Sequence, residues 1–296
     1  MTHTIRRVLL VSSLLLWALP ASGQVAKRPS AVGPNGVSSV AGTFPGLTVT
    51  SPGISSSSVT APRSGISLTG QAWPNDADDL AHVYFNGTAL VDTKGTVTWT
   101  AVGSAPTQSA ATLLCPARAS GFAAAHYYSG GNALTPAGSF TVCALINPGA
   151  VPGGEIIAKD NTGAGNRAWT MDLNSTGLEL YVWKTGGGPS NFTLASAVTA
   201  NTLGMVCVIY EYVADGTSKL HAFANGQYAA NQSTTAVGPV IANTTPVAIG
   251  ARAWTGNEQP FSGSIYEIQV INRALTSAEL RAKFELYRSW VAISCP

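Results

Sequence analysis

Short runs of alternating apolar and polar residues fill the chain from about residue 78 onward, and Gly, Pro, Asn or Asp separates them. The runs are rich in β-branched and aromatic residues, which is typical of β-strands joined by tight turns. Asp215-Gly216 and Asn225-Gly226 supply the positive φ angles that tight hairpins need. The predicted strands are 81–86, 96–101, 122–128, 140–147, 168–173, 178–184, 205–213, 219–224, 247–251 and 264–272.

One helix is expected near the C-terminus. Thr276 and Glu279 have the spacing of a capping box, in which each side chain bonds the backbone N–H of the other residue. One apolar stripe follows, made by Leu280, Phe284 and Tyr287. The pattern predicts a helix over 277–289 that packs against the sheets. Many short strands with a single helix favour an all-β sandwich or jelly roll over a parallel α/β sheet.

Segment 260–276 resembles the last strand and the following helix of laminin-G-like jelly rolls, in the concanavalin A-like lectin/glucanase family. Segments 140–148, 206–210 and 219–227 are similar to three earlier strands of that family, in the right order. The resemblance covers about residues 78–290. It implies a two-sheet antiparallel jelly-roll sandwich with one short C-terminal helix. It also implies binding of glycans or protein surfaces, in some members with calcium.

The N-terminus has the layout of a signal peptide. Arg6 and Arg7 precede an apolar run that ends at Leu19, and small residues follow at 21–23. The run is too short for a membrane span, which needs about 20 residues. We predict a signal peptide over 1–23 and a secreted chain, extracellular or periplasmic, with no membrane span.

Two regions of different composition follow the predicted signal peptide. Residues 24–77 are rich in Ser, Gly, Pro and Thr and almost uncharged, so they bury too little apolar surface to offset their ordering entropy. They are expected to form a spacer, or an arm that becomes ordered on a partner. Residues 78–296 are expected to form the jelly-roll domain.

The charge balance argues against nucleic acid as a partner. The chain has 16 Lys and Arg against 14 Asp and Glu, and loss of Arg6 and Arg7 would leave equal numbers. A nucleic-acid binder needs a positive field to neutralise phosphates. No cluster of basic residues follows residue 28.

Four cysteines, Cys115, Cys143, Cys207 and Cys295, are widely spaced and form no zinc motif. In an oxidising compartment an even number favours disulfides. We expect Cys115 to pair with Cys295, which would join the two ends of the domain. Cys143 and Cys207 lie in two apolar runs that could be neighbouring strands, so they are either a second disulfide or buried thiols.

Catalytic patterns were sought because the family also includes glucanases. Retaining glycosidases need two carboxylates about 5 Å apart, which related enzymes present on one strand. Glu179 and Glu267 each stand alone within a strand run, and no nucleophile elbow is present. Three histidines, His82, His126 and His221, lack metal-ligand spacing. The chain is therefore expected not to be an enzyme.

Aromatic side chains are the remaining candidates for ligand recognition, because a ring face offers apolar area at low entropy cost. Trp254 lies in a polar, Gly-containing loop before the last strand, and Asn257 and Glu258 could bond hydroxyl groups. Trp183 adjoins a Gly-rich turn and is expected on the same or another rim. The alternative for Trp254 is a ring folded onto the sheet as a lid.

Calcium is a candidate ion because of two oxygen-rich clusters, one at 160–162 and one at Asp76, Asp78 and Asp79. Asp160 and Asn161 are the proposed ligands, with a solvated loop as the alternative, since calcium takes about six to eight oxygens. Tyr266 stands where family members often carry a carboxylate, which weakens the calcium hypothesis.

Two functions remain after these exclusions. The first is a secreted binding module for a glycan or an extracellular protein surface. The second is a structural subunit of an extracellular coat or filament, a homo-oligomer in which residues 24–77 contact neighbouring copies.

Overall fold

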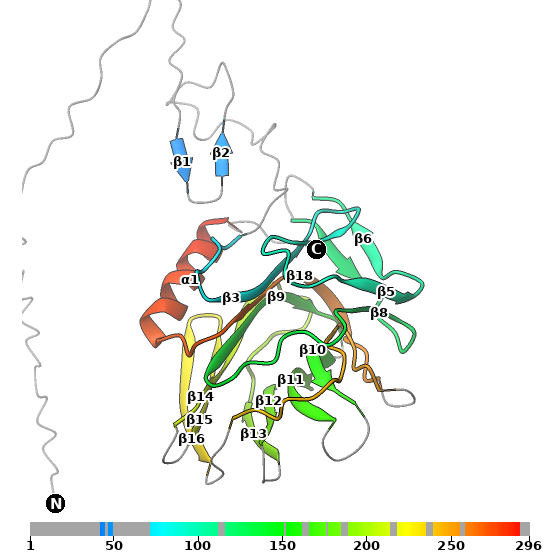
Figure 1. Cartoon of the computed structure of the whole chain (residues 1–296). Coiled ribbons are helices and arrows are strands. Elements are labelled where there is room, and N and C mark those ends of the chain that lie inside the picture. Colours follow the sequence, from blue (N-terminus) through cyan, green and yellow to red (C-terminus); the bar gives the residue numbers. More distant parts are fainter. Residues whose placement is uncertain are drawn as a thin grey trace, which may run out of the picture. The chain divides into compact units, whose positions relative to one another are not determined.

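The chain folds into a two-layer β-sandwich with one helix (Figure 1). The structure, a computed structural model, describes residues 42–44, 47–49, 72–111, 116–150, 152–161, 166–175, 177–184, 189–213, 218–234, 239–254 and 258–290. The predicted signal peptide, Cys115, Asn257 and Cys295 lie outside the described residues. Within the described residues, no helix is long and apolar enough to cross a membrane.

The elements are β1 (Gly42–Phe44), β2 (Leu47–Val49), β3 (Asp79–Phe85), β4 (Leu90–Asp92), β5 (Thr100–Gly103), β6 (Thr107–Ser109), β7 (Arg118–Ser120), β8 (His126–Ser129), β9 (Phe140–Pro148), β10 (Gly153–Asp160), β11 (Arg167–Asn174), β12 (Gly177–Trp183), β13 (Pro189–Leu194), β14 (Gly204–Glu211), β15 (Ser218–Ala224), β16 (Gln227–Thr234), β17 (Ala248–Ile249), β18 (Gly263–Ile271) and α1 (Ser277–Trp290).

Two antiparallel sheets form the sandwich. The seven-stranded sheet has the order β13-β12-β11-β10-β17-β8-β5. The nine-stranded sheet has the order β16-β15-β14-β9-β18-β3-β4, with β7 beside β18 and β6 beside β7. β1 and β2 form a separate two-stranded antiparallel sheet. This arrangement confirms the predicted jelly-roll sandwich.

The core lies between the sheets, and strand alternation fills it. In β14, Val206, Val208 and Tyr210 point inward, where they meet inward residues of β11 and β12 such as Met171 and Leu180. Because successive side chains of a strand point to opposite faces, every second residue of β14 is left for the outer face of the nine-stranded sheet.

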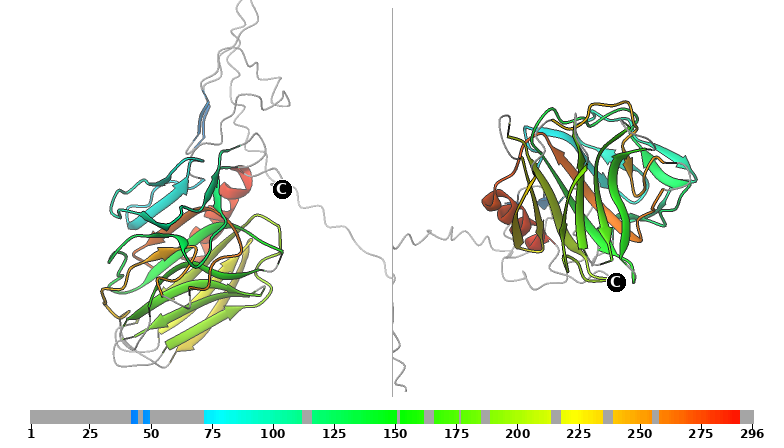
Figure 2. Two further views of the ribbon diagram at one scale, coloured as in Figure 1. Left: turned by 90° about the vertical axis from the view of Figure 1, so that its right-hand side faces the viewer. Right: turned by 90° about the horizontal axis from the view of Figure 1, so that it is seen from below.

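Helix α1 covers part of that outer face (Figure 2). A second apolar cluster lies beneath it, and Leu280 and Tyr287 of the helix pack there against Met205 of β14. The capping box forms as predicted, because the backbone N–H of Thr276 donates to Glu279 Oε2 at 2.8 Å and the Glu279 N–H donates to Thr276 Oγ1 at 3.3 Å.

Cys143 and Cys207 form a disulfide in the same cluster. They are register partners on the neighbouring strands β9 and β14, with Cα atoms 4.1 Å apart. This settles the choice between a disulfide and buried thiols for this pair.

A buried carboxylate anchors the segment that leads into β3. Glu267 of β18 accepts hydrogen bonds from the backbone N–H groups of Ala72 (2.5 Å) and Trp73 (3.1 Å). Its Oε1 also lies 2.6 Å from His82 Nε2, and the second ring nitrogen of His82 bonds Asn75 at 2.8 Å. Glu267 is therefore a structural carboxylate that binds backbone.

Several strands lay outside the predicted set. β4, β6 and β7 are only three residues long, and β13 and β16 carry many polar residues. β10 was missed for another reason: it carries charged residues, Glu155, Lys159 and Asp160, that are fully buried. Charged residues are depleted in strands and are seldom fully buried unless they are paired. The sequence pattern therefore argued against a buried strand here, whereas the tertiary partners of these charges make one possible.

Candidate functional site

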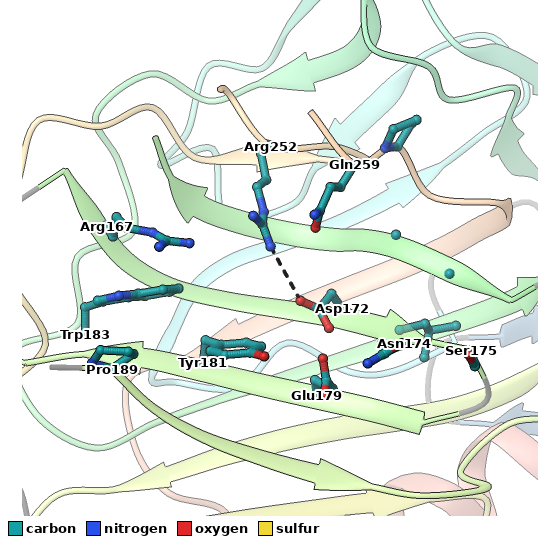
Figure 3. Close-up of a pocket in the computed structure, with 14 residues that line it drawn as sticks. Arg167, Asp172, Asn174, Ser175, Glu179, Tyr181, Trp183, Pro189, Arg252 and Gln259 are labelled. Carbon is teal, nitrogen blue, oxygen red and sulfur yellow. Dashed lines mark ion pairs between the residues drawn. The ribbon is translucent and has the colours of Figure 1, made fainter. Parts of the chain in front are cut away.

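A pocket of about 650 Å³ opens on the face of the seven-stranded sheet that is turned away from the core. In β12, Leu178, Leu180 and Val182 face the core, so the alternate residues face the pocket. The lining residues are Gly153, Gly154, Arg167, Asp172, Leu173, Asn174, Ser175, Glu179, Tyr181, Trp183, Pro189, Arg252, Gln259 and Pro260 (Figure 3).

Aromatic rings form one wall of the pocket. Tyr181 and Trp183 are two apart on β12, and their rings stack with centroids 5.7 Å apart and planes 19° from parallel. The Arg167 guanidinium lies 4.1 Å from the centroid of Trp183 and 5.3 Å from that of Trp254. Such contacts are favourable because a cation is attracted to the ring quadrupole. Arg167 thus joins the two predicted tryptophans.

Two carboxyl groups lie side by side at the other end of the pocket. Asp172 of β11 and Glu179 of β12 are direct register partners, and Asp172 lies between Glu179 and the Arg252 guanidinium (Figure 3). Arg252 Nη2 is 3.9 Å from Asp172 Oδ2, and Thr193 Oγ1 donates to Glu179 Oε1 at 2.6 Å. The pair is joined across strands, so a search for two carboxylates on one strand does not find it.

Burial sets the charge of these groups. Burial, followed by the charge of Glu179, raises the pKa of Asp172 to about 7, although Arg252 lowers it. A hydrogen bond with the Glu179 carboxyl adds to the effect, which requires a proton between the two groups. Burial, followed by the charge of Asp172, also raises the pKa of Glu155 well above its ordinary value.

The edge of the pocket that Gln259 and Pro260 form depends on a glycine. Gly154 has φ of +94°, and a Cβ there would lie 2.1 Å from the carbonyl oxygen of Pro260. Only glycine lets the segment before β18 approach this closely. The Glu155 N–H then donates to the Gln259 carbonyl at 2.9 Å, which fixes Gln259 and Pro260 at the pocket edge.

The predicted binding residues take different places. Trp183 lines the pocket, whereas the half-buried Trp254 contacts it through Arg167. Glu258 accepts the Arg252 N–H through its backbone oxygen at 2.6 Å. Asp172, Glu179 and Tyr181 were not among the predicted binding residues. The alternation of polar and aromatic residues at 179, 181 and 183 was the available signal, because it places all three on one face.

Asp160 and Asn161, the proposed calcium ligands, lie at the end of β10. The Asp160 carboxylate accepts two hydrogen bonds from Arg167, at 2.8 and 3.0 Å, and Arg252 Nε is 3.5 Å away. The part of the chain that the structure describes contains no group of three or more His, Cys, Asp or Glu side chains arranged to hold a metal ion. Calcium binding here stays an untested prediction.

Comparisons with known proteins support the fold. Residues 120–281 match the sequence profile of the concanavalin A-like lectin/glucanases superfamily. No curated protein sequence matches the chain. The structure is similar to the binding domain of botulinum neurotoxin serotype G, with 10% identity and a TM-score of 0.53. It is also similar to the binding domain of Paraclostridial mosquitocidal protein 1, with 11% identity and a TM-score of 0.52.

A third similar structure is the ligand binding domain of botulinum neurotoxin serotype D in complex with N-acetylneuraminic acid, with 13% identity and a TM-score of 0.51. These similarities cover 71%, 71% and 70% of this chain, and 51%, 52% and 50% of the three solved chains, in the same order. The chain therefore spans about half the length of these three structures. At these identities the likeness concerns the fold alone.

Proposed function

Because the chain belongs to the concanavalin A-like lectin/glucanase superfamily, we propose that it is a secreted, non-catalytic module that binds a glycan in the pocket on the seven-stranded sheet. The observation that carries the proposal is the position of Tyr181 and Trp183 beside Asp172, Glu179 and Arg252 in one open pocket. Ligand sites combine apolar and aromatic walls with a few convergent polar groups. A sugar ring needs both, one for its C–H face and one for its hydroxyls.

The geometry of the carboxyl pair favours binding over hydrolysis. Retaining glycosidases hold two carboxyls about 5 Å apart, and inverting enzymes hold them about 6.5–9.5 Å apart to admit water. Asp172 and Glu179 are direct register partners and adjoin each other on one face of the sheet (Figure 3). Adjoining side chains do not flank a space for a glycosidic bond, so they are poorly placed to act as separate acid and nucleophile.

Secretion is part of the proposal. The predicted signal peptide over 1–23 supports it, and so does the Cys143–Cys207 disulfide, because disulfides persist in oxidising compartments. In this proposal residues 24–77 form a spacer or arm, and the domain that follows carries the site.

A glycan array with the full-length chain tests the binding function. We expect the wild type to bind at least one glycan class, and Tyr181→Ala to weaken that binding about fivefold, because a stacked ring contributes on the order of 1 kcal/mol. Tyr228→Ala is the matched control, since Tyr228 is also half-buried but lies on β16 of the other sheet.

Two outcomes would contradict the proposal. One is the absence of binding to every glycan class, and the other is equal loss in both tyrosine variants. Incubation of the wild type with the bound glycan should produce no new reducing ends. The appearance of new reducing ends would show that the protein is a hydrolase and not a non-catalytic binding module.

A further inference from the structure

Carboxyl groups outnumber cations around the pocket. Among the described residues, four carboxyl groups lie in or directly beneath it, and two guanidinium groups face them: Glu155, Asp160, Asp172 and Glu179 against Arg167 and Arg252. Arg167 is held by Asp160 through two hydrogen bonds. Arg252 Nε donates to Glu155. The Asp172–Glu179 pair therefore shares its one nearby cation, Arg252, with Glu155 and Asp160.

Asp172 also has an unsatisfied oxygen. The residue is 5% exposed, and its Oδ1 has no hydrogen-bond donor among the described residues. Protonation of Asp172 lets the two carboxyls bond each other, but a buried acceptor without a donor costs about 1–3 kcal/mol whenever both are ionised. An incoming donor at this end of the pocket would remove that cost.

The chemistry of the missing donor follows from the charge. A hydroxyl group offers one donor and no charge, so it cannot offset the negative charge of the pair when both carboxyls are ionised. A primary ammonium offers three donors and a positive charge, so it can bond both carboxyl groups and favours the ionised form of Asp172. Tyr181 follows Glu179 by two residues on the same face of β12, so a ring attached to the ammonium would lie against the tyrosine.

We propose that the pocket selects glycans with a free, unacetylated amino group, with the ammonium bound between Asp172 and Glu179 and the sugar ring against Tyr181. This inference rests on the proposed glycan-binding function and names its ligand class. An acidic sugar is disfavoured at the same position, because its carboxylate would meet the carboxyl pair.

Calorimetry with full-length protein at pH 6.5 tests the selection. The probes are a glucosamine hexamer, the matching N-acetylglucosamine hexamer, and hexalysine, which carries primary ammonium groups without sugar rings. We expect the glucosamine hexamer to bind at least tenfold more tightly than each of the other two. The wild-type comparison needs no variant, so poor folding of a variant cannot obscure it.

Variants then locate the effect. Asp172→Asn/Glu179→Gln should reduce binding of the glucosamine hexamer to the level of the acetylated one. Glu285→Gln removes one carboxylate from the exposed face of α1, where its side chain is 60% exposed, and should leave the preference unchanged.

The outcomes separate the two proposals. Equal or tighter binding of the acetylated hexamer overturns the amino-group selection and leaves glycan binding intact. Binding of hexalysine as tight as that of the glucosamine hexamer also overturns it, because charge alone would then suffice. Failure of both oligosaccharides on the calorimeter and of every glycan on the array removes the binding function itself.

Discussion

The fold disfavours the ionised form of Asp172. Burial raises its pKa to about 7 from an ordinary 3.8, so the folded chain favours the protonated form. An unfolded chain ionises the same group near the ordinary value. As the pH rises from 4 through 7, the folded state must hold a proton that the unfolded state has released, and stability is lost.

Asp172→Asn should therefore stabilise the protein in a pH-dependent way. We expect the free energy of unfolding to rise by about 2–4 kcal/mol at pH 8 and to change little at pH 4, since one pKa unit corresponds to about 1.4 kcal/mol. Urea denaturation at the two pH values measures this.

Glu279→Gln provides a control of opposite sign. The Thr276 N–H, together with Arg273, holds the pKa of Glu279 below its ordinary value. The stabilisation by the Glu279 carboxylate is present above the unfolded pKa and lost at lower pH, so this variant should lose stability at pH 8.

A destabilised Asp172→Asn protein at pH 8 would contradict the first prediction, because it would show that the fold needs the Asp172 carboxylate.

At the scale of elements, Glu267 holds the segment 72–79 on β18. It accepts two backbone N–H bonds and faces His82. Glutamine at this position has one acceptor oxygen, and its NH2 group would face one of the backbone N–H donors that Glu267 now accepts. A buried donor left without an acceptor is costly.

We expect Glu267→Gln to lower the free energy of unfolding by about 2–3 kcal/mol and to speed amide hydrogen exchange over 72–79. Urea denaturation and mass-spectrometric hydrogen exchange measure the two effects. Glu285→Gln should stay within about 0.5 kcal/mol of the wild type, as surface changes do. Unchanged exchange over 72–79 would mean that Glu267 does not anchor this segment.

At the scale of the whole molecule, the Cys143–Cys207 disulfide spans 64 residues of sequence. That interval contains β10, β11, β12 and β13, the strands around the pocket, so the bond joins the two ends of the unit that carries the site. Closing so long a loop restricts the unfolded chain, which in the entropic account stabilises the folded one.

Cys143→Ala/Cys207→Ala should lower the free energy of unfolding by about 2–4 kcal/mol while leaving the pocket in place. Denaturation midpoints and glycan affinity, measured on the same preparation, test both parts. Affinity that falls well below the wild-type value in a folded variant would show that the disulfide also shapes the pocket.

The local pattern of the chain predicted the core strands and the helix. Apolar alternation in 140–147 and 205–213 gave β9 and β14, and Thr276 with Glu279 marked the start of α1. These signals can be recognised in a single sequence because each depends only on residues close together in the chain. The period of two along a strand is one example.

Only the tertiary structure decided the charged parts of the fold and the site. Glu155 and Asp160 are buried in β10 because Arg252 reaches Glu155 from a distant segment and Arg167 reaches Asp160 from the neighbouring strand β11. Asp172 meets Glu179 through the register of a hairpin. The sequence by itself determined which faces of the strands and of the helix are apolar. The tertiary structure determined which charged side chains meet, because the free energy of an ion pair depends on a partner that the local sequence pattern does not identify.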